Sequence, residues 1–291
     1  MVIAGLIFSC FMALVKALGT EMHPIQIGFL RYAFGLMFLL PFFLKVRKAD
    51  LKAANWKFHG LRGVMHGIGV MLWFYAMSRI PLAEVTAIGF TNTVFATVGA
   101  ALFLGEVIRL PRITAVVTGL AGAMLIIRPG FHEIDPGAFA MLGGALVFAC
   151  SDLCAKVLTR NESGPAVVAY LSIVVTLVTM GPAIYVWHDP SLREWGALVV
   201  IAGLATVGHL AMTHSFKLAE ISALQPAKFV QLLWSALIGF ALFAEVPDLF
   251  TWIGAALIVA SSLYIARREA LARRRGRATI QPAAKTGPPA P

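Results

Sequence analysis

The chain has 291 residues, of which 59% are hydrophobic and only 13% are charged. Soluble domains carry about 25% charged residues, so this composition argues against a soluble domain and predicts an integral membrane protein. The net charge of +10 is not a sign of nucleic-acid binding, because the basic residues gather in loops on one side of the predicted membrane.

Hydrophobic segments of about 20 residues, the length needed to cross a bilayer, recur along almost the whole chain. They predict an all-α integral membrane protein with ten transmembrane helices and connections too short to hold a soluble domain. The predicted spans are residues 2–20, 24–44, 58–79, 82–104, 111–128, 137–159, 165–187, 196–217, 221–244 and 249–267. Residues 268–291 are rich in Arg, Ala and Pro and are expected to form a disordered basic tail.

Basic residues are distributed unevenly between the loops. If the segment 45–57 faces the cytoplasm, most of the 24 Lys and Arg residues fall on that side, whereas the opposite loops hold Arg79, Arg128 and Arg193. This asymmetry follows the positive-inside rule and predicts a multi-pass protein of a bacterial inner membrane with both termini and the basic tail in the cytoplasm.

The three cysteines, Cys10, Cys150 and Cys154, all lie within predicted spans, so no disulfide framework is expected. Cys150 and Cys154 share a helix face, as two metal ligands could, but no His or carboxylate clusters with them in the sequence. Close packing of small residues is the favoured interpretation, and neither a metal nor a cofactor is expected.

The two halves of the sequence resemble each other at a nearly constant offset. The segment 6–18, LIFSCFMALVKAL, aligns with 146–158, LVFACSDLCAKVL, at an offset of 140 residues, so that Lys16 matches Lys156. AEVTAI at 83–88 aligns with AEISAL at 219–224. Because each half holds five predicted spans, the second copy enters the membrane from the opposite side, and such inverted repeats are typical of secondary transporters.

The segments 18–41, LGTEMHPIQIGFLRYAFGLMFLLP, and 101–130, ALFLGEVIRLPRITAVVTGLAGAMLIIRPG, are similar to the EamA branch of the drug/metabolite transporter superfamily. The resemblance covers about residues 1–268. It implies one EamA repeat over 1–128 and another over 129–267, with a central cavity lined by helices 1, 3, 4, 6, 8 and 9. The second half departs from the pattern, since FAE replaces LGE before Val246 and Ser172 stands where Arg31 has its counterpart.

The fourth and ninth spans carry matching polar and aromatic residues. Three pairs align at an offset of 139 residues: Phe90 with Phe229, Asn92 with Gln231, and Phe95 with Trp234. Gly89 and Pro226 predict weak points in these two helices, and interrupted helices at matching positions indicate the binding site of a transporter. A kink packed against a neighbouring helix is the alternative to a cavity.

These patterns give a set of candidate substrate-binding residues. They are Asn92, Lys228, Gln231, Trp234, Trp73, Tyr75 and His209. Lys228 is notable because a lysine inside a bilayer costs about 2.5–3.5 kcal/mol, and its repeat counterpart is Gly89. Trp73 and Tyr75 offer either a stacking surface for substrate or interfacial aromatics near the outer membrane face.

The candidates for a coupling or ion-pair role are Asp152, Lys156, Lys16 and His66. Asp152 is the only acid well inside the predicted membrane, and its repeat counterpart is Met12. Asp152 either pairs with Lys156 four residues later or acts as a carboxylate linked to a proton or substrate. Lys16 and Lys156 either snorkel to opposite membrane surfaces or flank the two mouths of the cavity.

The function expected is a secondary transporter that moves a small polar metabolite by alternating access, since no Walker A motif is present. Cations, amides and aromatics suit a zwitterionic or anionic substrate with a flat ring, and the resemblance suggests riboflavin or an amino-acid-like compound. A metabolite, metallophore or drug exporter of the same family is the alternative. An integral membrane transferase and a non-transporting scaffold or receptor are the competing classes.

Expected partners are the substrate and membrane lipids. A homodimer is left open, and no nucleic acid is expected.

Overall fold

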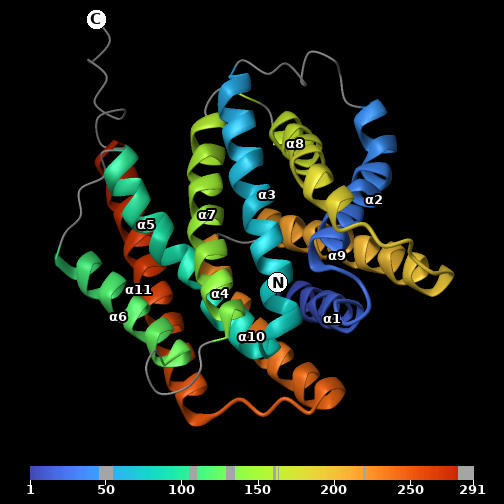
Figure 1. Ribbon diagram of the computed structural model, residues 1–291. Coiled ribbons are helices and arrows are strands. Elements are labelled where there is room, and N and C mark those ends of the chain that lie inside the picture. Colours follow the sequence, from blue (N-terminus) through green and yellow to red (C-terminus); the bar gives the residue numbers. More distant parts are fainter. Residues whose placement is uncertain are drawn as a thin grey trace, which may run out of the picture.

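The computed structural model (Figure 1) describes residues 1–45, 55–104, 110–128, 135–159, 162, 164–218 and 221–280. The described residues form eleven α-helices and no strand, which confirms the all-α class. The helices are α1 Val2–Leu18, α2 Pro24–Lys45, α3 Trp56–Arg79, α4 Leu82–Gly89, α5 Thr91–Leu104, α6 Leu110–Ile127, α7 Pro136–Leu158, α8 Gly164–Tyr185, α9 Leu192–Leu218, α10 Ile221–Phe243 and α11 Leu249–Ile280.

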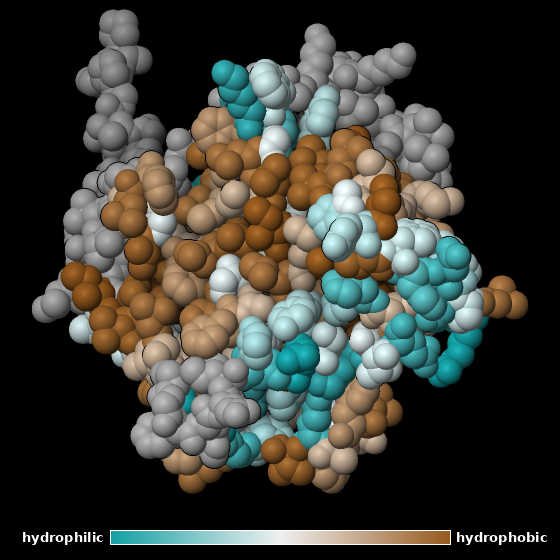
Figure 2. Space-filling model, in the orientation of Figure 1, coloured by the Kyte–Doolittle hydropathy of each residue, from teal (hydrophilic) through white to brown (hydrophobic). Residues whose placement is uncertain are grey.

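The apolar character of these helices identifies a multi-pass membrane protein. Within the described residues, five helical segments are long and apolar enough to cross a bilayer, and three shorter helices are also apolar. Large hydrophobic side chains such as Leu233, Leu237 and Phe240 on α10 are exposed. Figure 2 shows hydrophobic residues over much of the visible surface, with hydrophilic ones in the lower centre, at the right and at the upper edge. An exposed apolar surface of this kind is what lipid requires of a bundle of helices.

The fourth predicted span is two helices in the structure. α4 ends at Gly89 and α5 begins at Thr91, so the expected interruption at this place is confirmed. The matching interruption expected at Pro226 is wrong, because α10 runs from Ile221 to Phe243 without a break. Proline removes one backbone hydrogen bond, and near the start of a helix this loss leaves the remaining turns intact.

Small residues allow close contact between several helix pairs. α3 packs against α7 and α8, α1 against α9 and α10, and α6 against α11. Gly63 and Gly67 of α3 face Val174 and Val178 of α8, where a Cβ atom would have no room. Close approach at small residues is the usual way in which membrane helices associate.

The last helix extends beyond the predicted membrane span. α11 continues to Ile280, which places part of the expected disordered tail, 268–291, in a helix. Residues 281–291 lie outside the described part of the chain.

Candidate functional site

The break between α4 and α5 brings an amide beside the one acid predicted to lie well inside the membrane. Asn92 is the second residue of α5, and its Nδ2 donates to Asp152 Oδ2 on α7 at 3.2 Å. The side chain of Asp152 is exposed, and its charge also acts on Arg62 of α3. Two candidates that lie 60 residues apart in the sequence therefore meet in the structure.

The matching position in the other half has a related contact with different chemistry. Gln231 Nε2 of α10 donates to Met12 Sδ of α1 at 3.8 Å. By the offset in the sequence, Gln231 corresponds to Asn92 and Met12 corresponds to Asp152, so the two matched contacts each join the first half of the chain to the second. Met12 is only 1% exposed, whereas Asp152 is exposed. One position is packed in the interior and the other is accessible.

Phe90 and Phe229, which are also repeat counterparts, touch each other. Their ring centroids lie 4.7 Å apart in an edge-to-face arrangement, the geometry that aromatic pairs prefer. A contact between two equivalent residues is expected where a symmetry axis relates two halves of a chain.

A chain of hydroxyl groups joins α1, α4 and α10 next to the Gln231–Met12 contact. Ser9 Oγ lies 3.0 Å from Ser235 Oγ, and Thr86 Oγ1 donates to Ser235 Oγ at 2.8 Å. Ser9 Oγ also lies 3.3 Å from the Gln231 carbonyl oxygen, to which it can donate. All three hydroxyls are buried, and hydrogen bonds between side chains of this kind connect helices inside a membrane.

The two histidine candidates lie in different places. His66 Nε2 is 3.0 Å from the Tyr32 hydroxyl, and its Nδ1 is 3.4 Å from Ser151 Oγ, beside Asp152. His209 lies on α9, where its Nδ1 is 2.7 Å from the Ala205 carbonyl oxygen. Because a carbonyl can only accept, Nδ1 of His209 must carry a proton. His66 is therefore part of the Asp152 region, and His209 binds within its own helix.

The aromatic candidates are also divided between two regions. The Trp73 ring packs against Phe11 at 5.7 Å and Phe148 at 6.2 Å between ring centroids. Trp234 Nε1 is buried and has no hydrogen-bond partner among the described residues. Tyr75 lies near Arg79, 5.7 Å from its guanidinium carbon to the ring centroid, a contact that favours the interfacial interpretation for this residue.

Two of the three lysine candidates lie on α7 and α10. Lys156 is exposed on α7. Lys228 belongs to α10, but its side chain lies outside the described residues.

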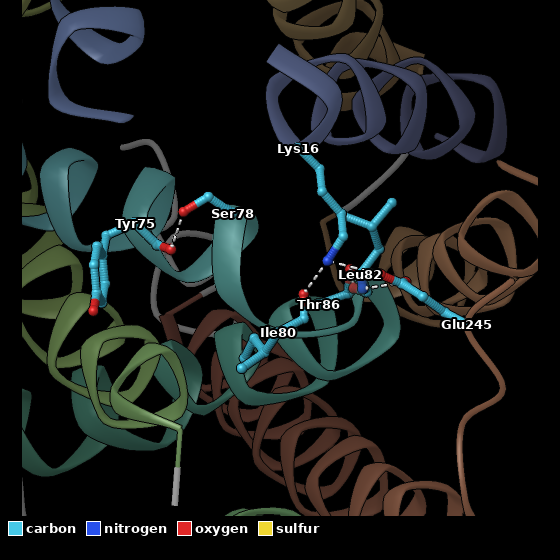
Figure 3. Close-up of polar contacts among 7 residues, drawn as sticks. All are labelled: Lys16, Tyr75, Ser78, Ile80, Leu82, Thr86 and Glu245. Atoms are coloured by element: carbon cyan, nitrogen blue, oxygen red, sulfur yellow. Dashed lines mark hydrogen bonds and ion pairs between the residues drawn. The ribbon is translucent and has the colours of Figure 1, made fainter. Parts of the chain in front are cut away.

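Lys16, a candidate for an ion-pair role, pairs with Glu245, a partner that the sequence did not identify. Its Nζ lies 2.7 Å from Glu245 Oε1 and donates to the Ile80 carbonyl oxygen at 2.7 Å. Glu245 Oε2 accepts a hydrogen bond from the backbone N–H of Leu82 at 2.8 Å. Figure 3 shows Lys16 reaching from α1 to the turn between α3 and α4, where Glu245 meets it. Snorkelling therefore does not describe Lys16.

The three arginines of the sparsely charged loops each have an acidic partner. Arg79 Nε lies 3.5 Å from Asp135, Arg193 lies 3.5 Å from Glu21, and Arg128 pairs with Asp248.

Comparisons with known proteins match the chain to one family of transporters. A family model described as the EamA-like transporter family matches residues 1–128 and 135–267. The S-adenosylmethionine uptake transporter of Rickettsia bellii (strain RML369-C) is 28% identical over 250 residues, which is 86% of each chain. The riboflavin transporter of Rhizobium johnstonii is 30% identical and covers 92% of this chain and 90% of its own.

Two further similarities extend the comparison. The pseudopaline exporter CntI of Pseudomonas aeruginosa is 28% identical and covers 91% of this chain and 94% of its own. One solved structure matches with a TM-score of 0.58 at 19% identity, covering 90% of this chain and 96% of the other. At that identity the structural match shows the fold alone.

Proposed function

The chain belongs to the EamA-like transporter family, and we propose that it moves a small polar metabolite across a bacterial inner membrane by alternating access. The family and the named relatives are transporters, so the alternative of a membrane transferase enzyme does not hold. The absence of a Walker A motif in the sequence argues for secondary transport without direct use of ATP.

The proposed layout is ten transmembrane spans arranged as two inverted repeats, 1–128 and 129–267. The related contacts of Asn92 with Asp152 and of Gln231 with Met12 support this layout. The contact between the equivalent residues Phe90 and Phe229 supports it as well. The proposal puts both termini in the cytoplasm, because most Lys and Arg residues of the loops and the tail then lie on that side.

The proposed substrate site centres on the Asn92–Asp152 pair, which is the observation that carries the proposal. An accessible carboxylate with a bound amide can hold an amino or ring N–H group of a substrate. His66 and Ser151 border the pair, and Trp73 and the unpartnered indole N–H of Trp234 offer an aromatic surface and a donor. Lys228 and Gln231 complete the site in the proposal.

The proposed substrate is a zwitterionic or anionic compound with a flat ring, such as riboflavin or an amino-acid-like metabolite. Relatives named for riboflavin and for S-adenosylmethionine agree with this class. Export of a metabolite, metallophore or drug is the alternative, which the relative named pseudopaline exporter supports.

The test begins with ligand binding to the purified full-length protein. Riboflavin, S-adenosylmethionine and the amino acids are screened for a rise in melting temperature, since a ligand at 100 times its Kd stabilises a protein by about 2.7 kcal/mol. Compounds that bind are then assayed for uptake and efflux in proteoliposomes. If no compound of this class binds or moves, the proposed function is wrong.

The site is tested with Lys228→Ala and Gln231→Ala. Both variants are expected to abolish transport while the protein still inserts into the membrane. Thr118→Ala is the matched control, because its hydroxyl donates to the Thr114 carbonyl of its own helix, α6. Normal transport by both site variants would show that the site lies elsewhere.

A further inference from the structure

Lys16 and Glu245 join the first and second halves of the chain at one end of the molecule (Figure 3). Lys16 lies in the last turn of α1, and Glu245 follows the end of α10. The two side chains are only 15% and 11% exposed. An ion pair this well shielded is screened by salt much less than a surface pair.

The backbone at the end of α10 aims Glu245 back over its own helix. Ala244 has a φ of 54°, in the left-handed region that an alanine seldom adopts. The N–H of Ala244 bonds the Phe240 carbonyl oxygen, which is the bond of an αL helix end, and the N–H of Glu245 bonds the Gly239 carbonyl oxygen. A non-glycine residue is held in this conformation only where its surroundings determine it, and such places are often functional.

Gly239 leaves the space that the Glu245 carboxylate occupies. A Cβ atom at position 239 would lie 2.5 Å from Glu245 Oε2. The same oxygen accepts from the Leu82 N–H at the start of α4, where a helix N-terminus favours a negative charge. The carboxylate is therefore held by three elements: the end of α1, the start of α4 and the end of α10.

These three elements line the proposed transport path, and they are also joined deeper in the membrane by the hydroxyls of Ser9, Thr86 and Ser235. We infer that the Lys16–Glu245 ion pair is a latch that holds the outer end of the path closed and breaks each time the path opens outward. This inference rests on the proposed transport function and its orientation. The latch residues take no part in the proposed substrate site.

The opposite end of the molecule differs at the matching positions. Lys156 is the repeat counterpart of Lys16 and is exposed, and Asp152 on the same helix is exposed too. Lys16 and Met12, the counterparts on α1, are shielded. Polar groups of the path are thus accessible toward one end and covered at the latch end.

The other ion pair close to α1 does not act in this way. Arg193 and Glu21 lie 3.5 Å apart with side chains that are 86% and 46% exposed. Exposed pairs of this kind contribute little to holding a structure together. Glu21 is therefore a matched control, an acid near the same end of the molecule that is not part of the latch.

The latch is tested by access of a thiol reagent to the buried side of α10. Ser235 is fully buried and lies about 12 Å below the end of α10, at 1.5 Å per residue. Full-length protein carrying Ser235→Cys is expressed in cells and treated from outside with a membrane-impermeant thiosulfonate. Peptide mass spectrometry then measures the labelling of position 235 separately from that of Cys10, Cys150 and Cys154.

Removal of the Glu245 charge should open the outer end. Glu245→Gln keeps an oxygen to accept from Leu82, and we expect labelling at least about tenfold faster, since loss of one partner strongly destabilises a shielded pair. Lys16→Met should act in the same direction. Glu21→Gln should leave the labelling rate unchanged.

The outcomes separate the latch from the transport proposal. Labelling that stays slow in both Glu245→Gln and Lys16→Met, with both proteins inserted and stable in detergent, would overturn the latch even if metabolite transport is found. Equal acceleration by Glu21→Gln would overturn it as well, because the effect would then be a general one of surface charge. Fast labelling in Glu245→Gln and in Lys16→Met, together with slow labelling in Glu21→Gln, supports the latch, whether or not a substrate is known.

Discussion

Asn92 donates a hydrogen bond to Asp152 across α5 and α7 at 3.2 Å, and this pair carries the first prediction. Asp152→Asn keeps the size and polarity of the side chain but removes its charge. Transport should fall at least about tenfold, the change that corresponds to about 1.4 kcal/mol of lost interaction with the substrate. Any dependence of the transport rate on pH should also disappear. Initial rates in proteoliposomes at several pH values measure both effects.

A retained rate with an unchanged pH profile would leave Asp152 with a structural role only. Asn92→Ala serves as the partner variant, because it removes the amide and keeps the charge. It should lower the rate less than Asp152→Asn and leave the pH profile in place.

Truncation of Met12 should lower the stability of the protein, whereas truncation of its repeat counterpart Asp152 should abolish transport. Met12 is 1% exposed, and a buried Met→Ala substitution costs about 2–5 kcal/mol of stability. Asp152→Ala, at an exposed position, should change stability by less than about 0.5 kcal/mol and abolish transport. Melting temperature and transport rate, measured on the same preparations, separate the two roles. Equal loss of stability in both variants would contradict the assignment.

The sequence could predict which positions correspond, because the offset between the halves stays near 140 residues. It therefore aligns Asn92 with Gln231 and Met12 with Asp152 as corresponding positions in the two halves. It also predicted the weak point in the fourth span, where Gly89 ends α4. The interruption at Pro226 was wrong, since hydropathy and proline content do not say whether the neighbouring turns can hold a helix together.

The Lys16–Glu245 pair could not be predicted from these patterns. It depends on the left-handed backbone at Ala244 and on the space above Gly239, and neither leaves a mark in the charge or hydropathy pattern. Lys16 near the end of a span fits snorkelling equally well when its partner is unknown. Three-dimensional structure decides between the two interpretations.

Asp248, which lies outside the membrane spans, should make the stability of the protein depend on pH. Partial burial acts to raise the pKa of Asp248, but hydrogen bonds from Thr251 and the charge of Arg128 outweigh it and hold the pKa below its ordinary value. A lowered folded-state pKa stabilises the protein above the unfolded-state pKa of about 3.9, and this contribution is lost as the pH falls through the folded-state value. Asp248→Asn should therefore lower the melting temperature at pH 7, and the difference should shrink as the pH falls below the unfolded-state pKa of about 3.9.

The comparison is made in one detergent over this pH range, with Asp189→Asn as the control. The Asp189 carboxylate accepts from the Trp187 ring N–H at the exposed surface and should give a much smaller difference. A constant difference between wild type and Asp248→Asn at every pH would show that the charge is not responsible.

The crossing of α6 and α11 depends on two glycines. A Cβ atom at Gly122 would lie 2.6 Å from the Gly254 carbonyl oxygen, which belongs to backbone and cannot swing aside. Gly122→Ala should therefore force the two helices apart and lower the melting temperature. Gly203→Ala in α9 is the control, because a Cβ atom there meets nothing within 4 Å, and alanine is favoured over glycine within a helix by about 1 kcal/mol. Equal melting temperatures for the two variants would contradict the close crossing.

Gly239 gives a way to disturb the latch without altering either of its charges. A Cβ atom at position 239 would lie 2.5 Å from Glu245 Oε2, so in Gly239→Ala the carboxylate must shift, which disturbs its contacts with Lys16 and the Leu82 N–H. Outside labelling of Ser235→Cys should then rise in the same direction as in Glu245→Gln, although helix propensity alone favours the alanine. Gly203→Ala in the same background should leave the labelling rate as it is. If Gly239→Ala labels no faster than Gly203→Ala, the position of the carboxylate does not control the outer end, and the ion pair is only a structural contact.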